Sequence, residues 1–222
     1  VIRDWSSDVC SSDLLSQLAN EIITRAEKVT EDFAVSQDLK DFIQKARENR
    51  WRLMVRSTGK EDSQQVSNAG GNESFANVSP TIQDVVKALL GVIASYIKPK
   101  SVGQRLDVGD ETTFDVPFVP VLVQRMIGEK INGAKNSINI PTGCVVFSKE
   151  PNGKVDDVTL IQASFGHNEN VVQNGIVDSF LVDKHDTIFS VIKVKPDRLI
   201  PAKHDGWFGL ERKTNPALLQ KR

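Results

Sequence analysis

The chain has 222 residues, of which 39% are hydrophobic and 26% charged, so it can bury a core and is not compositionally disordered. Its 28 Lys and Arg residues against 29 Asp and Glu residues give a formal net charge of -1, which argues against a dedicated nucleic-acid or polybasic membrane binder. No apolar run approaches the ~20 residues that a membrane-spanning helix needs.

Cysteine and histidine usage argues against a metal or disulfide scaffold. Cys10 and Cys144 cannot supply a disulfide framework or a multi-thiolate zinc site. The three histidines are too far apart in sequence for an i, i+4 metal-binding pair (His167, His185 and His204). A reduced, cytoplasmic setting is therefore expected.

The first fourteen residues differ from the rest of the chain. Ser-Ser-Asp occurs twice in this stretch, and Asp4, Asp8 and Asp13 interrupt any apolar face. The stretch resembles the translation of a common sequencing-adapter oligonucleotide, although a genuine disordered arm is the alternative. We expect residues 1–14 to be a non-native segment and set them aside from the fold.

Helices are predicted for most of the first half. Apolar residues at helical spacing indicate a helix from Leu15 to Val29, and Ser36 is the predicted N-cap of a second helix that runs through Ala46. A short strand over 51–56 and a polar loop over 57–77 follow. A third helix is predicted to begin with Pro80 at its first position, and a surface loop is predicted beyond it, up to Asp115.

Strands are predicted for the second half, over residues 118–127, 144–148, 158–163, 176–182 and 187–194. Asn-Gly pairs and other turn residues separate them. Helices followed by an antiparallel meander predict an α+β fold.

Two constellations in the first predicted sheet region could bind a nucleotide. Arg56, at a strand end, opens into a loop with Ser57, Thr58 and Gly70, and such a loop offers guanidinium, hydroxyl and backbone donors to phosphate oxygens. A solvated loop with one surface arginine is the commoner reading of this spacing alone.

The second constellation is the strand that contains Gln124. Strand alternation places Gln124 and Met126 on one face with Leu122, and the intervening residues on the other. A glutamine on a buried face needs hydrogen-bond partners, which a purine edge or, more commonly, a neighbouring backbone could supply.

Two further constellations lie in the second half. Gly143 permits close backbone approach before a strand, and Thr142 beside it offers a hydroxyl. Further on, His167 and Glu169 follow a strand and could perform acid–base chemistry, although a loop pair that bonds only to backbone is the more frequent arrangement.

Taken in order, these four segments resemble the motifs of the phosphoenolpyruvate synthase and pyruvate phosphate dikinase family, from about Leu15 to the C-terminus. The resemblance implies an ATP-grasp-like nucleotide-binding domain of α+β class that is incomplete at both ends, with residues 15–222 forming part of it. It also implies that ATP phosphorylates a histidine on a separate domain of the parent chain, which passes the phosphate to pyruvate and yields phosphoenolpyruvate, AMP and phosphate.

The resemblance also implies roles for individual residues. Arg56 matches the catalytic arginine, which contacts phosphate. The expected ATP-binding residues are Arg56, Ser57, Thr58, Gly70, Gln124, Met126, Thr142, Gly143 and Glu169. The family's Asp-x-Glu pair, which holds Mg²⁺, has no match before the chain ends, so no metal ligand is expected here and the fragment alone is expected to be inactive.

One departure leaves the phosphate acceptor open. His167-Asn168 stands where the family has Leu-Gly ahead of Glu169, which indicates a divergent branch. A module of a rifampin phosphotransferase or glucan water dikinase type is therefore an alternative, as is a non-catalytic nucleotide-binding module. ATP and the phosphohistidine domain are the expected partners, with no nucleic acid and no membrane.

Overall fold

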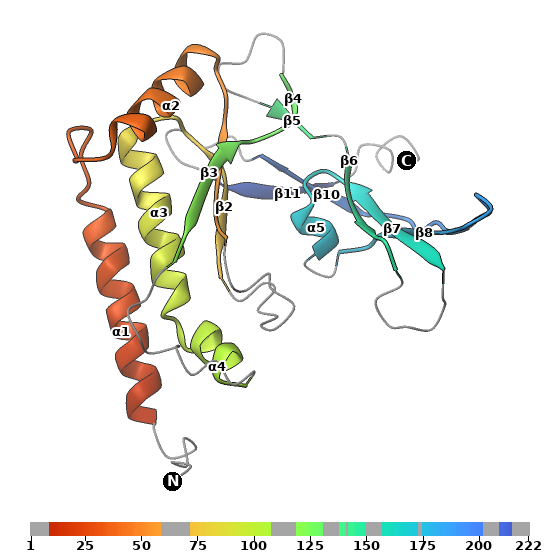
Figure 1. Cartoon of the computed structure of the whole chain (residues 1–222), viewed down its shortest axis with the longest axis horizontal. Helices are drawn as coiled ribbons and strands as arrows, with labels where there is room; N and C mark the ends of the chain where they lie inside the picture. Colours follow the sequence, from red (N-terminus) through yellow and green to blue (C-terminus); the bar gives the residue numbers. More distant parts are fainter. Residues whose placement is uncertain are drawn as a thin grey trace. The chain divides into compact units, whose positions relative to one another are not determined.

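The computed structural model describes residues 9–58, 72–107, 119–130, 138–140, 142–149, 157–172, 175–201 and 209–214. The chain divides after Met126 into two compact units, and the second unit begins at Ile127. Figure 1 traces the chain through the helices and strands of both units.

Unit 1 combines helices with an antiparallel sheet in which β1 is central and β2 and β3 flank it. α3 packs on this sheet and α1 packs on α3 (Figure 1). The elements are α1 (Val9–Ala26), α2 (Gln37–Glu48), β1 (Leu53–Ser57), β2 (Ser74–Val78), α3 (Ile82–Tyr96), α4 (Pro99–Asp107) and β3 (Val121–Arg125).

The core of unit 1 is made of small and medium aliphatic side chains from α2, α3 and the sheet. Leu53 and Val55 of β1 are both 0% exposed, and burial of each such side chain contributes about 1.5–3 kcal/mol. Successive side chains of a strand point to opposite faces, so Met54 and Arg56 lie on the face away from this core. The core residues are Ile43, Ala46, Leu53, Val55, Val78, Val85, Ala88 and Val92.

The predicted helices are present, with differences at their ends. The Ser36 hydroxyl accepts a hydrogen bond from the Leu39 N–H, which confirms the predicted N-cap of α2. The third helix does not begin at Pro80, because Thr81 adopts an extended conformation and its hydroxyl caps α3 through the Asp84 N–H. The first helix begins at Val9, six residues before the predicted start at Leu15.

Two segments predicted as loops contain regular structure. β2 begins within the predicted loop over 57–77 and ends at Val78, because Phe75 and its neighbours pair with β1 despite their polar flanks. The predicted surface loop after Lys98 is helical as far as Asp107, because Val102 and Arg105 of α4 are buried. The remainder of that predicted loop, 108–115, lies outside the described residues.

Unit 2 is built mainly from antiparallel strands, as predicted, and the two units together give the α+β class. Its largest described sheet is a meander in the order β6-β7-β8-β9, and β4 pairs with β5 and β10 with β11. The elements are β4 (Glu129–Lys130), β5 (Ile138–Asn139), β6 (Thr142–Phe147), β7 (Val158–Phe165), α5 (Glu169–Val172), β8 (Asp178–Asp183), β9 (Ile188–Val191), β10 (Asp197–Pro201) and β11 (Leu210–Thr214).

Candidate functional site

Arg56, Ser57 and Thr58 lie where β1 ends, on the sheet of unit 1. The Arg56 side chain is exposed, and its Nε donates to the Ser57 carbonyl at 3.3 Å. The Thr58 N–H donates to the Pro120 carbonyl at 2.9 Å, so backbone pairing continues one residue beyond β1. The Arg56 guanidinium is therefore carried by a strand end that is fixed by backbone bonds. Gly70 lies outside the described residues.

Gln124 lies on the same face of the sheet as Arg56. β1 and β3 pair with Arg56 opposite Leu122 and Met54 opposite Gln124, so these four residues share the face away from the core. Gln124 is exposed and Leu122 is 42% exposed, which leaves this face open within unit 1. A guanidinium, an amide and an apolar side chain together suit a ligand with an anionic end and a flat polar ring.

Met126, predicted on the same face as Gln124, is 5% exposed, whereas Gln124 is exposed. The Met126 N–H donates to the Arg52 carbonyl at 2.8 Å, and its Sδ accepts a hydrogen bond from the Asn77 N–H at 3.1 Å. The thioether is thus packed beside β2 within unit 1.

Thr142 and Gly143 begin β6 in unit 2, where they pair with Phe165 and Ser164 of β7. Thr142 is exposed and Gly143 is buried. A Cβ atom on Gly143 would come within 2.4 Å of the Asn168 amide oxygen, which no real Cβ contact allows. Glycine is therefore required here, because the turn that carries Glu169 packs directly on the β6 backbone.

Glu169 begins the short helix α5, and the His167 ring contacts the backbone of Glu169. The Glu169 N–H donates to His167 Nδ1 at 3.2 Å, a bond that needs an unprotonated Nδ1. Burial lowers the pKa of His167 below its ordinary value, which favours this neutral form. His167 Nδ1 lies 4.0 Å from the Glu169 carboxylate. His167 thus bonds to the backbone of the turn that carries Glu169.

A buried asparagine that sequence reasoning missed holds this turn in place. Asn170 is 3% exposed; its Nδ2 donates to Ser164 Oγ at 3.0 Å, and its Oδ1 accepts from Arg212 Nη1 at 3.0 Å. Its carbonyl accepts the Gly175 N–H at 2.9 Å. The partners lie up to 42 positions away in sequence, so no local pattern could have identified them.

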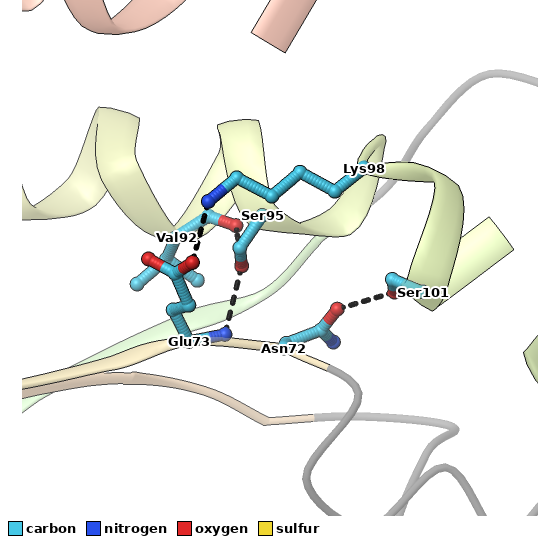
Figure 2. Close-up of polar contacts among 6 residues, drawn as sticks. All are labelled: Asn72, Glu73, Val92, Ser95, Lys98 and Ser101. Atoms are coloured by element: carbon cyan, nitrogen blue, oxygen red, sulfur yellow. Dashed lines mark hydrogen bonds and ion pairs between the residues drawn. The ribbon is translucent and has the colours of Figure 1, made fainter. Parts of the chain in front are cut away.

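The chain that leads into β2 is fixed by a second polar cluster, shown in Figure 2. The Glu73 N–H donates to Ser95 Oγ at 2.9 Å, and Ser101 Oγ donates to Asn72 Oδ1 at 2.7 Å. Lys98 Nζ pairs with the Glu73 carboxylate at 2.5 Å. Because Ser74, the next residue, pairs with Arg56, α3 and α4 fix the strand beside this arginine.

The predicted binding residues therefore fall into two groups among the described residues. Arg56, Ser57, Thr58, Gln124 and Met126 belong to unit 1, whereas Thr142, Gly143 and Glu169 belong to unit 2. No group of three or more His, Cys, Asp or Glu side chains that could hold a metal ion occurs in the described part of the chain. Within the same part, no helix is long and apolar enough to cross a membrane.

Comparison with known proteins gives two matches. The family model described as "Pyruvate phosphate dikinase, AMP/ATP-binding domain" matches residues 7–206. A phosphoenolpyruvate synthase of Neisseria meningitidis serogroup B (strain ATCC BAA-335 / MC58) is 31% identical over 134 residues, which cover 60% of this chain. The same match covers 15% of that relative, so the chain corresponds to a small part of its length.

Proposed function

The chain belongs to the family of pyruvate phosphate dikinase AMP/ATP-binding domains, and from this membership we propose that it binds ATP as part of a dikinase. The observation that carries the proposal is the shared face of β1 and β3, where Arg56 and Gln124 lie exposed on paired strands. An ATP-grasp-like fold of the domain is part of the proposal.

We assign the phosphates to the end of β1. Arg56 would pair with phosphate oxygens through its forked donors, and the Ser57 and Thr58 hydroxyls and Gly70 would assist. A guanidinium fixed at this position would neutralise the charge that develops on the transferring phosphoryl group. This makes Arg56 the proposed catalytic residue of the chain.

We assign the base to β3 and the remaining contacts to unit 2. Gln124 would present its amide to the purine edge, while the buried Met126 would fix the end of the strand. Thr142 and Glu169 would offer a hydroxyl and a carboxylate, and Gly143 would let the Glu169 turn pack closely on β6. The buried Asn170 supports this assignment because it ties that turn to β7.

The reaction of the parent protein is proposed from the relative's name, which favours pyruvate as the acceptor. ATP would phosphorylate a histidine of a separate domain of that protein; pyruvate would finally receive one phosphoryl group and water the other, with AMP and phosphate released. No step is assigned to a metal in this chain. We expect no phosphotransfer by the 222-residue chain alone, and a cytoplasmic setting stays part of the proposal.

The experiment is calorimetric titration of the purified chain with ATP. We expect saturable binding that Arg56→Ala weakens about tenfold or more, because a charge-assisted pair is lost. Arg25→Ala is the matched control, since Arg25 is an exposed arginine on α1 that pairs with Glu21 of the same helix. Absence of ATP binding by the wild-type chain, or equal losses in both variants, would refute the proposal.

A further inference from the structure

Arg52, which directly precedes β1, is a buried charge with an extensive set of acceptors. It is 7% exposed; its Nε donates to Asn77 Oδ1 and its Nη1 to Ser79 Oγ, both at 2.8 Å. Its Nη2 donates to the Asn77 carbonyl. Burying a guanidinium is costly unless its donors are satisfied, so this set of bonds constrains Arg52 and Asn77 to one geometry.

Asn77 is held in an unusual backbone conformation. Its φ is 61°, in the left-handed region that non-glycine residues rarely adopt and that asparagine tolerates best. It is 4% exposed, and the pairing of β1 with β2 is irregular between Leu53 and Val55. In this conformation the Asn77 N–H donates to Met126 Sδ at 3.1 Å, while its side chain and carbonyl accept from Arg52.

The network ends on the residue that follows β3. The Met126 N–H donates to the Arg52 carbonyl at 2.8 Å, so Arg52 holds β2 by its side chain and the end of β3 by its backbone. The neighbouring Arg125 guanidinium lies 4.9 Å from the centre of the Trp51 ring, a second contact between the same two segments. Met126, two residues after Gln124, is thus held by the backbone of Arg52 and by Asn77 of β2.

We propose that Arg52 and Asn77 are positioning residues that fix the end of β3 so that Gln124 presents its amide to the nucleobase. This rests on the proposed nucleotide binding. The network lies at the base end of the proposed site, and Arg56 lies at the phosphate end. Loss of the network should therefore weaken binding of the base and leave binding of the phosphates unchanged.

Three variants remove different parts of the network. Arg52→Lys keeps the charge but loses the forked donors. Asn77→Gly keeps the left-handed backbone and removes the amide oxygen. Met126→Leu nearly preserves volume and removes the sulfur acceptor, so it is the variant most certain to fold. Arg105→Lys is the matched control, because Arg105 is 4% exposed in unit 1 but bonds to Ser101 and Tyr96 instead of β3.

The test compares the affinities of folded variants for ATP, adenosine and inorganic tripolyphosphate by calorimetric titration. We expect about tenfold weaker binding of ATP and adenosine in the Arg52 and Asn77 variants, a smaller effect in Met126→Leu, and unchanged tripolyphosphate binding. Arg105→Lys should leave all three affinities unchanged. A network that is merely structural would alter ATP and tripolyphosphate equally, or neither, and either result would overturn the inference.

Failure of the proposed function has a different signature. If wild-type chain bound neither ATP nor tripolyphosphate, or if Gln124→Ala bound ATP as tightly as wild type, the assignment of the nucleotide to this face would be wrong, and the inference with it. If wild type bound ATP and Gln124→Ala weakened it while Arg52→Lys did not, the inference alone would be wrong.

Discussion

Gly143 of β6 and Asn168 of the turn before α5 lie so close that a Cβ atom on the glycine would come within 2.4 Å of the asparagine amide oxygen and 2.7 Å of its backbone nitrogen. The first of two proposed binding segments in unit 2 therefore supports the second, which carries Glu169. A substitution in either segment should therefore displace the other segment.

Gly143→Ala should destabilise unit 2 by about 1–3 kcal/mol, because the turn must shift to admit the methyl group. Gly103→Ala in α4 is the matched control: nothing lies within 4 Å of its Cβ position, and alanine should stabilise that helix by about 0.5–1 kcal/mol. Urea unfolding of both variants gives the two free energies. Equal stabilities for the two variants would contradict the packing described here.

The polar cluster of Figure 2 contains a buried hydroxyl and a partly exposed ion pair, whose contributions to stability can be compared. Ser101→Ala should cost about 1–3 kcal/mol, because Ser101 is 0% exposed and its hydroxyl bonds to both Asn72 and Arg105. Lys98→Ala should cost at most about 1 kcal/mol, since its ion pair with Glu73 is partly exposed to solvent. Thermal unfolding measures both changes, and the reverse order would show that the cluster does not fix the start of β2.

The His167 imidazole gives a pH dependence of stability with a definite sign. Burial lowers its folded-state pKa below the ordinary 6.5, so above about pH 7.5 it is largely neutral in both states and has little effect. As the pH falls from 6.5 toward the folded pKa, the unfolded chain binds a proton first, and the free energy of unfolding decreases by up to about 1.4 kcal/mol per pH unit.

His167→Gln removes this titration and should lose less stability than wild type between about pH 7.5 and about pH 5.5. Urea unfolding at the two pH values measures the difference. Identical pH dependence in the two proteins would mean that His167 titrates as an exposed imidazole.

Deletion of residues 1–14 tests the proposal that this stretch is foreign to the domain. Leu14 is 68% exposed, and Ala19, which is 1% exposed, lies beyond the deletion. We expect the free energy of unfolding to change by no more than about 0.5 kcal/mol, as for other surface changes, and ATP affinity to stay the same. A loss of several kcal/mol would assign these residues to the fold.

Short-range sequence signals predicted many of the helices and strands. Ser36 before an amphipathic run located α2 because capping and periodicity act within a few residues. β2 was missed because its polar residues resemble a loop. The Arg52 side chain that bonds to Asn77 of β2 lies 25 positions away in sequence. α4 was missed for a similar reason, since Arg105 is buried only when it stacks on Tyr96, with its guanidinium carbon 3.6 Å from the ring centre.

The exposed residues of the proposed site can be singled out from the sequence, and the buried residues that support them cannot. Arg56 and Gln124 are visible in sequence because their motifs are contiguous. The partners of the buried Asn77 and Asn170 come from segments 25 and 42 positions away, so only the folded chain reveals them. Met126 shows the same limit, since its burial depends on contacts with Arg52 and Asn77, which are distant in sequence.

The most direct measurement of the central claim is the change in backbone amide NMR shifts as ATP is added to the purified chain. We predict saturable shifts at Arg56, Ser57 and Gln124 in unit 1 and at Thr142 and Glu169 in unit 2, with no comparable change along α1. Shifts confined to other parts of the chain, or none at saturating ATP, would contradict the proposed nucleotide site.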